Sequence, residues 1–160
     1  MFALGNTSET NLVGVTPKLI CCVRYAIKRT TVDFSVFEGL RSLDRQRRLV
    51  AAGASRTMDS YHLTGEAVDL VPYVDKRLQW QMPLCIEVAR VMLWASRDLS
   101  VPLVWGGVWD RELASLDVDR LEEEIDAYVA RWRAANAQAW QEGKRPLIDG
   151  PHFQKVRERK

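Results

Sequence analysis

The sequence has few cysteines, no long apolar run and little net charge, and each absence argues against a class of protein. Its three cysteines, Cys21, Cys22 and Cys85, are too few for a disulfide framework. They also lack the C-x-x-C spacing of a zinc–thiolate site, so we expect three small buried hydrophobic side chains. No apolar stretch reaches the roughly 20 residues that span a bilayer, which argues against stable membrane insertion. A net charge of +2 is too small to indicate binding to nucleic acid.

Length and the first residues suggest how the chain is organised. A chain of 160 residues is long enough to bury a substantial core, and we predict a single domain over residues 1–160. The first residues, MFALGNTSETN, lack the basic start and apolar core of a signal peptide. We therefore expect the protein to be made and folded in a cytoplasm, whatever compartment it acts in.

Hydrophobic periodicity predicts helices that alternate with short strands. Residues 1–15 are expected to form a loosely structured lead-in. Apolar positions recur at helical spacing in residues 17–28, 42–52, 83–99 and 117–141, with Thr16 and Ser42 as the first two N-caps. Short apolar or alternating runs predict strands near residues 32–38, 67–71, 101–105 and 152–156. We expect the second of these strands to end at Pro72.

The chain has only two histidines, and each lies in a segment that also contains an aspartate. His62 precedes Asp69 by seven residues. The apolar run around Asp69 predicts a buried strand that could return this carboxylate to the imidazole. Far downstream, Asp149 precedes His152 by three residues in the segment D-G-P-H-F.

These residue types are the ones that a hydrolytic zinc site uses. Such a site commonly has three nitrogen or oxygen ligands and keeps a fourth position for water, and His62, Asp69 and His152 would supply the three. The ion acidifies the water and polarises a carbonyl oxygen. Asp149 is then a candidate base that accepts the proton of the water and passes it to the departing amine. A structural histidine or a turn-capping aspartate is the alternative for each residue alone, but the paired motifs favour a zinc peptidase.

Four segments of the chain together resemble one family of peptidases. Their patterns are S-x-H-x-x-G-x-A-x-D at 60–69, D-x-P-H-F at 149–153, E-G-x-R-S with a following Gln at 38–46, and W-G-G at 105–107. The combination is similar to the VanY and D-Ala-D-Ala carboxypeptidase family of zinc peptidases. Within it, the chain most resembles the L-alanyl-D-glutamate endopeptidases, which include bacteriophage endolysins. The resemblance extends from about Leu12 to Phe153.

The resemblance implies an α+β fold and a role for each site residue. The fold would be a small antiparallel sheet that carries zinc on one face and is flanked by helices, as in hedgehog and D-Ala-D-Ala peptidase-like domains. The residues implied are His62, Asp69 and His152 as zinc ligands, Asp149 as general base, Arg41 as the arginine that steadies the oxyanion and substrate, and Ser60 and Trp105 as substrate contacts. A surface salt bridge is the alternative for Arg41, and a local turn hydrogen bond is the alternative for Ser60.

The chain departs from the family pattern in two places. Val108 stands where the family turn W-G-G-D-W has its aspartate, which puts a polar contact there in doubt. Residues of about 110–147 form an insertion of helical character where close relatives have a short link. We expect its apolar stripe to pack on the domain, and a lid or glycan contact through Trp132 or Trp140 is the alternative.

The function implied by the resemblance is peptidoglycan degradation. We expect a monomeric zinc endopeptidase that hydrolyses the L-Ala–D-Glu bond of the stem peptide through a zinc-activated water, with Asp149 as base. It would accumulate as a phage endolysin in the host cytoplasm and act on the cell wall in the periplasm once a holin opens the membrane. The alternatives are a D-alanyl-D-alanine carboxypeptidase and a non-catalytic, zinc-containing module that binds the cell wall. The presence of Asp149 favours catalysis over the binding module.

Overall fold

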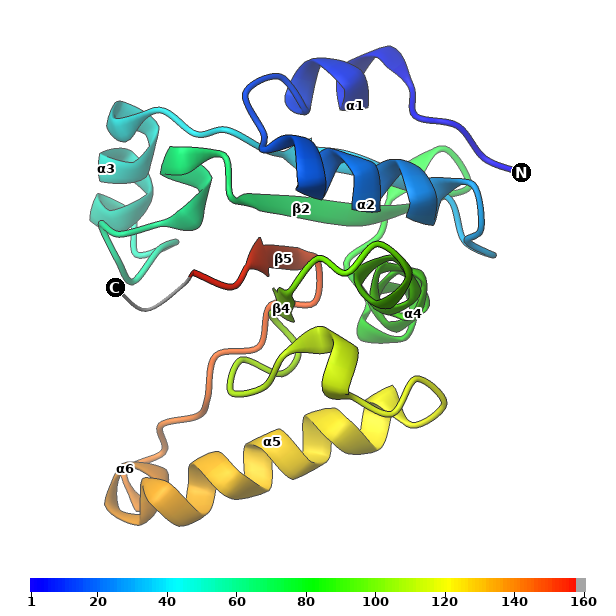
Figure 1. Ribbon diagram of the computed structural model, residues 1–160. Helices are drawn as coiled ribbons and strands as arrows, with labels where there is room; N and C mark the ends of the chain where they lie inside the picture. Colours follow the sequence, from blue (N-terminus) through cyan, green and yellow to red (C-terminus); the bar gives the residue numbers. More distant parts are fainter. Residues whose placement is uncertain (158–160) are drawn as a thin grey trace.

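A small antiparallel sheet lies at the centre of the computed structural model, which describes residues 1–157 (Figure 1). Its strands are β1 (Phe34–Glu38), β2 (Ala67–Val74), β5 (His152–Lys155) and β4 (Leu103–Trp105), in this spatial order. A short β3 (Arg77–Leu78) pairs with β2 outside this path. Because β5 lies between β2 and β4, a strand near the end of the chain is in the middle of the sheet. The predicted α+β fold is confirmed.

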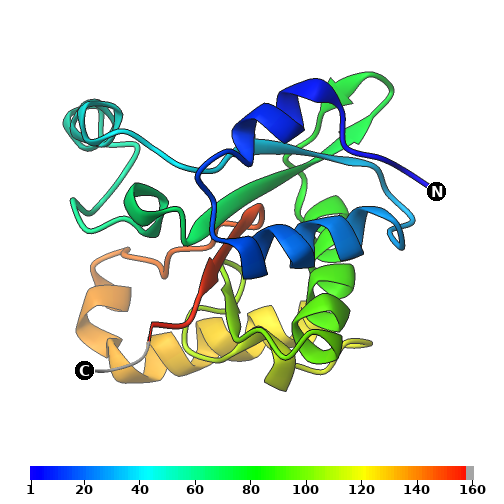
Figure 2. The ribbon, with the colours of Figure 1, turned by 45° about the horizontal axis from the view of Figure 1, so that its top comes forward.

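Helices complete the core around this sheet. α2 (Pro17–Ile27) and α4 (Met82–Asp98) pack against each other, and α4 also contacts β2 (Figure 2). Their apolar faces are buried together with Val68 and Leu70 of β2. The remaining helical elements are α1 (Asn6–Asn11), α3 (Leu43–Ala51), η1 (Tyr61–Thr64), η2 (Leu113–Ser115), α5 (Leu121–Ala135) and α6 (Ala137–Gln141).

The expectation of a loosely structured lead-in at residues 1–15 is wrong. α1 forms there and packs on β1, and Leu12 and Val15 are buried. The side-chain amide of Asn11 donates hydrogen bonds to the carbonyl oxygens of Val36 and Phe37, at 2.8 and 3.1 Å. These long-range bonds hold a helix that is too short to be stable alone.

The predicted end of the second strand at Pro72 is also wrong, since β2 continues to Val74. The N–H of Tyr73 donates to the carbonyl of Asp33 at 2.7 Å, so odd-numbered residues here direct their hydrogen bonds toward β1. The nitrogen and carbonyl of Pro72 point to the other side, where the carbonyl accepts a hydrogen bond from the N–H of Gln79 at 2.8 Å, next to β3. The missing N–H of Pro72 therefore removes no bond between β1 and β2.

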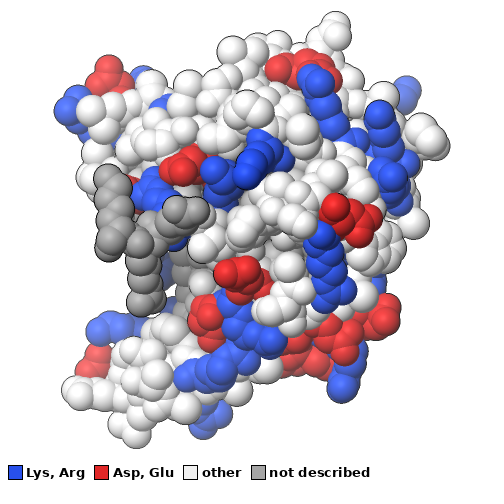
Figure 3. All heavy atoms as spheres, viewed as in Figure 1, with Lys and Arg blue, Asp and Glu red and all other residues white. Residues whose placement is uncertain are grey.

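The helix predicted over residues 117–141 is shorter and interrupted. α5 begins at Leu121, and Asn136 leaves the helical conformation (φ −131°, ψ 45°) before α6. Only the first half of the predicted apolar stripe is buried, at Leu121, Ile125 and Tyr128. Acidic side chains occupy the first turn of α5, where they suit the helix dipole, and acidic atoms gather over this region in Figure 3.

The other predicted elements are confirmed to within a few residues. Ser42 caps α3 by accepting a hydrogen bond from the N–H of Arg45 at 3.2 Å, whereas the hydroxyl of Thr16 makes no such bond. Cys22 and Cys85 are buried as expected, and this burial raises the pKa of both thiols to about 11, but Cys21 is exposed. None of the helices within residues 1–157 is long and apolar enough to cross a membrane.

We predict that α5 unfolds together with the rest of a single domain. Leu121, which is 1% exposed, joins the main core. Leu121→Ala should therefore lower the free energy of unfolding by about 2–5 kcal/mol in one urea transition. Leu99→Ala, at a leucine that is 40% exposed, is the matched control and should cost clearly less. A separate transition for residues 110–147 would contradict the single-domain prediction.

Candidate active site

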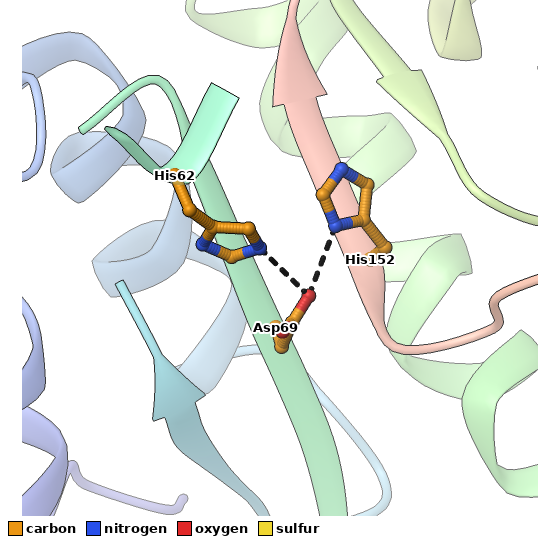
Figure 4. A group of neighbouring side chains, drawn as sticks. All are labelled: His62, Asp69 and His152. Atoms are coloured by element: carbon orange, nitrogen blue, oxygen red, sulfur yellow. Dashed lines mark hydrogen bonds and ion pairs between the residues drawn. The ribbon is translucent and has the colours of Figure 1, made fainter. Parts of the chain in front are cut away.

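Three predicted ligands meet on one side of β2 (Figure 4). His62 lies in η1, Asp69 lies on β2, and His152 is the first residue of β5. The Cα atoms of Asp69 and His152 are direct partners across the two strands. Asp69 Oδ1 lies 3.3 Å from His62 Nε2 and 3.0 Å from His152 Nδ1. One ligand atom from each residue lies within 4.8 Å of the other two, which makes this group a potential metal site.

In each imidazole, the outer nitrogen, which is the one that does not face Asp69, already has a hydrogen-bond acceptor. His62 Nδ1 lies 2.7 Å from the carbonyl oxygen of Gly39, which can only accept, so this nitrogen carries a proton. His152 Nε2 lies 3.0 Å from the side-chain oxygen of Gln154 and donates to it in the same way. The two inner nitrogens, His62 Nε2 and His152 Nδ1, face Asp69. A proton on either nitrogen hydrogen-bonds to the carboxylate, and loss of that proton leaves a lone pair that can bind a metal ion. Three electron-rich atoms at this spacing fit a shared cation, and two imidazoles with a carboxylate suit zinc.

The electrostatics of the group also favour a positive charge at its centre. Burial raises the pKa of Asp69, but hydrogen bonds with His152 and His62 outweigh burial and hold that pKa well below its usual range. Burial lowers the pKa of His152, but the hydrogen bond with Asp69 outweighs it and raises that pKa. Asp69 is therefore ionised at neutral pH, and its charge attracts a cation.

A turn at residues 105–107 holds Asp149 beside this group. The N–H of Asp149 donates to the carbonyl of Gly106 at 2.8 Å, and the N–H of Gly106 donates to the carbonyl of His152 at 2.9 Å. A Cβ atom on Gly106 would lie 2.1 Å from the carbonyl oxygen of Asp149, so only glycine fits here. Trp105 donates its indole N–H to the carbonyl of Gly150 at 2.7 Å. The W-G-G turn thus fixes the backbone that carries both Asp149 and His152.

Asp149 has the environment of a proton acceptor. Its side chain lines the same cleft as His62, Asp69 and His152. Burial raises the pKa of Asp149, and the negative charge of Asp69 raises it further. A carboxylate whose pKa is moved toward neutral pH is a stronger base than an exposed one.

The prediction that Trp105 contacts substrate is corrected by its position. Its side chain is fully buried in the core and has no exposed surface to offer a substrate. Val108 is buried as well, so the residue at the family's aspartate position contributes to the core. Trp109 lines the cleft instead, and its ring centroid lies 5.2 Å from that of His152. Trp109 was not predicted from the sequence, although the second tryptophan of the family turn W-G-G-D-W could have identified it.

Arg41 lies in a buried network and not on the surface. Its side chain is 10% exposed and forms an ion pair with Glu38, while Nη2 lies 3.9 Å from Asp69 Oδ2. Arg41 Nη1 donates to the side-chain oxygen of Gln46 at 2.7 Å. The amide of Gln46 in turn donates to the carbonyl of Thr57 at 2.6 Å, which ties α3 to the loop before η1. The E-G-x-R-S and Gln segment therefore supports one wall of the site.

Ser60 is at the N-cap of η1. Its hydroxyl accepts a hydrogen bond from the N–H of His62 at 3.3 Å, which is the local turn bond considered as an alternative. Ser60 also lines the cleft, so the same residue can position His62 and border a substrate.

The site forms part of a cleft with a volume of about 660 Å³. One wall comes from β1, α3 and the loop that leads to η1, and the other includes Trp109, Leu147 and Asp149. Arg41, Arg45 and Arg56 line the cleft, and Glu38, which also lines it, forms ion pairs with Arg41 and Arg45. Sequence patterns did not single out Arg45, Arg56 or Gln154, because they belong to no motif that names a chemistry.

Comparisons with known proteins find similar peptidases. A model of the family described as phage L-alanyl-D-glutamate peptidase matches residues 1–129. An L-alanyl-D-glutamate peptidase of Escherichia phage T5 is 29% identical over 113 residues, which cover 68% of this chain and 82% of that protein. An L-alanyl-D-glutamate peptidase of Listeria phage A118 is 31% identical over 78 residues, which cover 49% of this chain and 27% of that longer protein. The crystal structure of the Serratia marcescens L-Ala D-Glu endopeptidase ChiX is similar over 96% of this chain and 90% of that chain, with 33% identity and a TM-score of 0.70.

We predict that Gly106→Ala disrupts the site through the backbone. The added Cβ must push away the carbonyl of Asp149, so the free energy of unfolding should fall by about 1–3 kcal/mol and peptidase activity should be lost. Gly5→Ala is the control, because a Cβ there meets nothing within 4 Å. Thermal unfolding and activity on cell walls measure both effects. Equal stability and equal activity of the two variants would contradict the proposed role of the turn.

Proposed function

The chain belongs to the phage L-alanyl-D-glutamate peptidase family, and we propose that His62, Asp69 and His152 hold the zinc ion of its reaction. As a member, it is a peptidoglycan-cleaving endolysin that hydrolyses the L-Ala–D-Glu bond of the stem peptide. The observation that carries the zinc proposal is the convergence of His62 Nε2, Asp69 Oδ1 and His152 Nδ1, with both outer imidazole nitrogens hydrogen-bonded. Zinc, when bound, supplies a Lewis acid that acidifies water and polarises the scissile carbonyl.

The residues around the ligands then have separate roles in hydrolysis. Asp149 accepts a proton from the attacking water and delivers it to the amine of D-Glu as the peptide bond breaks. The raised pKa of Asp149 suits both transfers. Arg41 lies beside Asp69 with its guanidinium held by Glu38 and Gln46, so it offers fixed donors to the oxygen that becomes negative.

The arginines of the cleft suit the charge of the substrate. The D-Glu residue of a stem peptide carries a carboxylate close to the bond that is cut. Arg45 and Arg56 line the cleft together with Arg41, and their guanidinium groups can pair with such carboxylates. We propose that Ser60 borders the peptide on the same wall. We further propose that the protein acts as a monomer and reaches the wall in the periplasm from the host cytoplasm.

Two alternatives remain distinguishable by experiment. A D-alanyl-D-alanine carboxypeptidase would use the same ligands and base on a different bond. A non-catalytic module that binds zinc and the cell wall would have no need of a half-buried carboxylate beside the metal. Asp149, held in place by the W-G-G turn, favours an enzyme.

We predict that zinc content separates the ligands from the base. His62→Ala, Asp69→Ala and His152→Ala should each lose zinc, while Asp149→Ala should keep about one zinc per chain and lose activity. Elemental analysis of the purified variants measures this. Chelation of the wild type should also lower the melting temperature, because metal at a thousandfold excess over its Kd stabilises the fold by about 4 kcal/mol. If Asp149→Ala lost zinc as readily as the other three variants, the division of roles would be wrong.

We predict that the products of peptidoglycan digestion show cleavage of the L-Ala–D-Glu bond. Mass spectrometry of digested muropeptides should show L-Ala that is still joined to the sugar and carries a free carboxylate, and a peptide with a new amino terminus at D-Glu. Release of terminal D-alanine alone, with the L-Ala–D-Glu bond intact, would support the carboxypeptidase instead. Binding to walls without any new product would support the non-catalytic module.

A further inference from the structure

Two exposed aromatic rings lie at the edge of the cleft and have no role in the reaction described above. Phe37 of β1 is 43% exposed and Trp80, just before α4, is 54% exposed. Their ring centroids are 5.2 Å apart with the planes at 83° to each other. Both residues line the same cleft as the metal group. Large apolar side chains that stay exposed beside a site indicate a surface for a ligand.

The other aromatic rings that line the cleft are already covered by neighbours in the described part of the chain. The guanidinium of Arg157 lies 3.7 Å from the ring centroid of Tyr61. Trp109 packs against His152. Phe37 and Trp80 therefore present the aromatic surface that a ligand in this cleft can reach.

The insertion offers a weaker surface of this kind. Trp140 of α6 lies beneath Arg145, whose guanidinium is 3.9 Å from the ring centroid, and Arg133 lies 5.1 Å from the same centroid. The groove around Trp140 is lined by residues of α5 and α6 and includes none of the metal group. A ligand bound there would have no direct route to the reacting bond.

The position of Phe37 on β1 places it close to the metal group. The pairing of β1 with β2 shifts register between Val36 and Glu38, so Phe37 lies in a bulge. Glu38, the next residue, is the Cα partner of Asp69. Neighbouring strands lie about 4.8 Å apart, and a bulge beside a site redirects a side chain. Phe37 is thus one residue from the cross-strand neighbour of a proposed ligand.

We propose that Phe37 and Trp80 form a binding site for the N-acetylmuramic acid sugar that carries the stem peptide. This inference rests on the proposed function. In peptidoglycan the amino group of L-Ala is joined to the lactyl group of this sugar, so a single amino acid separates the sugar from the bond that is cut. At about 3.5 Å per residue, the sugar lies within about 10 Å of the metal. The C–H face of a sugar packs on aromatic rings, while the carboxylates of the peptide suit the arginines that line the cleft, Arg41, Arg45 and Arg56.

The experiment compares two substrates that differ only in the sugar. One is N-acetylmuramoyl-L-Ala-D-Glu-meso-diaminopimelate-D-Ala, and the other is the same tetrapeptide with an acetylated amino terminus, which keeps the amide at L-Ala. Wild-type protein should have a higher kcat/KM for the sugar-linked peptide. Trp80→Ala should reduce this preference about tenfold, mainly through KM, and Trp80→Phe should retain part of it. Phe37→Ala should reduce the preference in the same direction.

Two matched variants serve as controls. Trp94→Ala removes a tryptophan of α4 that is 38% exposed and is not among the residues lining the cleft, so it should leave the preference unchanged. Trp140→Ala tests the insertion, and loss of the preference in this variant would overturn the inference. Equal kcat/KM of the wild type for both substrates, or an equal loss on both in Trp80→Ala, would also overturn it while the proposed function stands. Failure of the wild type to cut either peptide would reject the proposed function and the inference with it.

Discussion

The register between β2 and β5 is the constraint on which the site depends. It places Asp69 directly opposite His152, although 83 residues separate them in the chain. Side chains alternate between the two faces of a strand, so a slip of one residue would turn His152 away from Asp69. The apolar residues that flank Asp69 on β2, Val68 and Leu70, oppose such a slip because they are fully buried against the helices. The hydrophobic core therefore determines the geometry of the polar site.

The turns around the sheet extend this constraint to the other side chains. Gly106 allows the backbone of Asp149 to approach β4, and the indole of Trp105 holds the next carbonyl. On the opposite wall, Gln46 joins Arg41 to the loop before η1, and the carbonyl of Gly39 orients the imidazole of His62. Each family motif thus supplies a contact that positions a group in the cleft, even where its own side chain is buried.

The sequence predicted that His62, Asp69 and His152 come together, because metal chemistry uses few residue types and the chain has only two histidines. The role of Trp105 could not be predicted in the same way, since a motif does not reveal whether a side chain faces the cleft or the core. The helix at residues 6–11 and the extension of β2 past Pro72 depend on bonds to distant strands, so local patterns missed both. Elements whose apolar faces are local and periodic, such as α2 and α4, were predicted well.

The central claim is that one metal ion joins His62, Asp69 and His152. X-ray absorption at the zinc edge, on the zinc-loaded protein in solution, tests it most directly. The account predicts a shell of two imidazole nitrogens with carboxylate and water oxygens at about 2.0–2.2 Å, and the loss of one imidazole in His152→Ala. A sulfur ligand at about 2.3 Å, or a shell with the same two imidazoles in that variant, would contradict it.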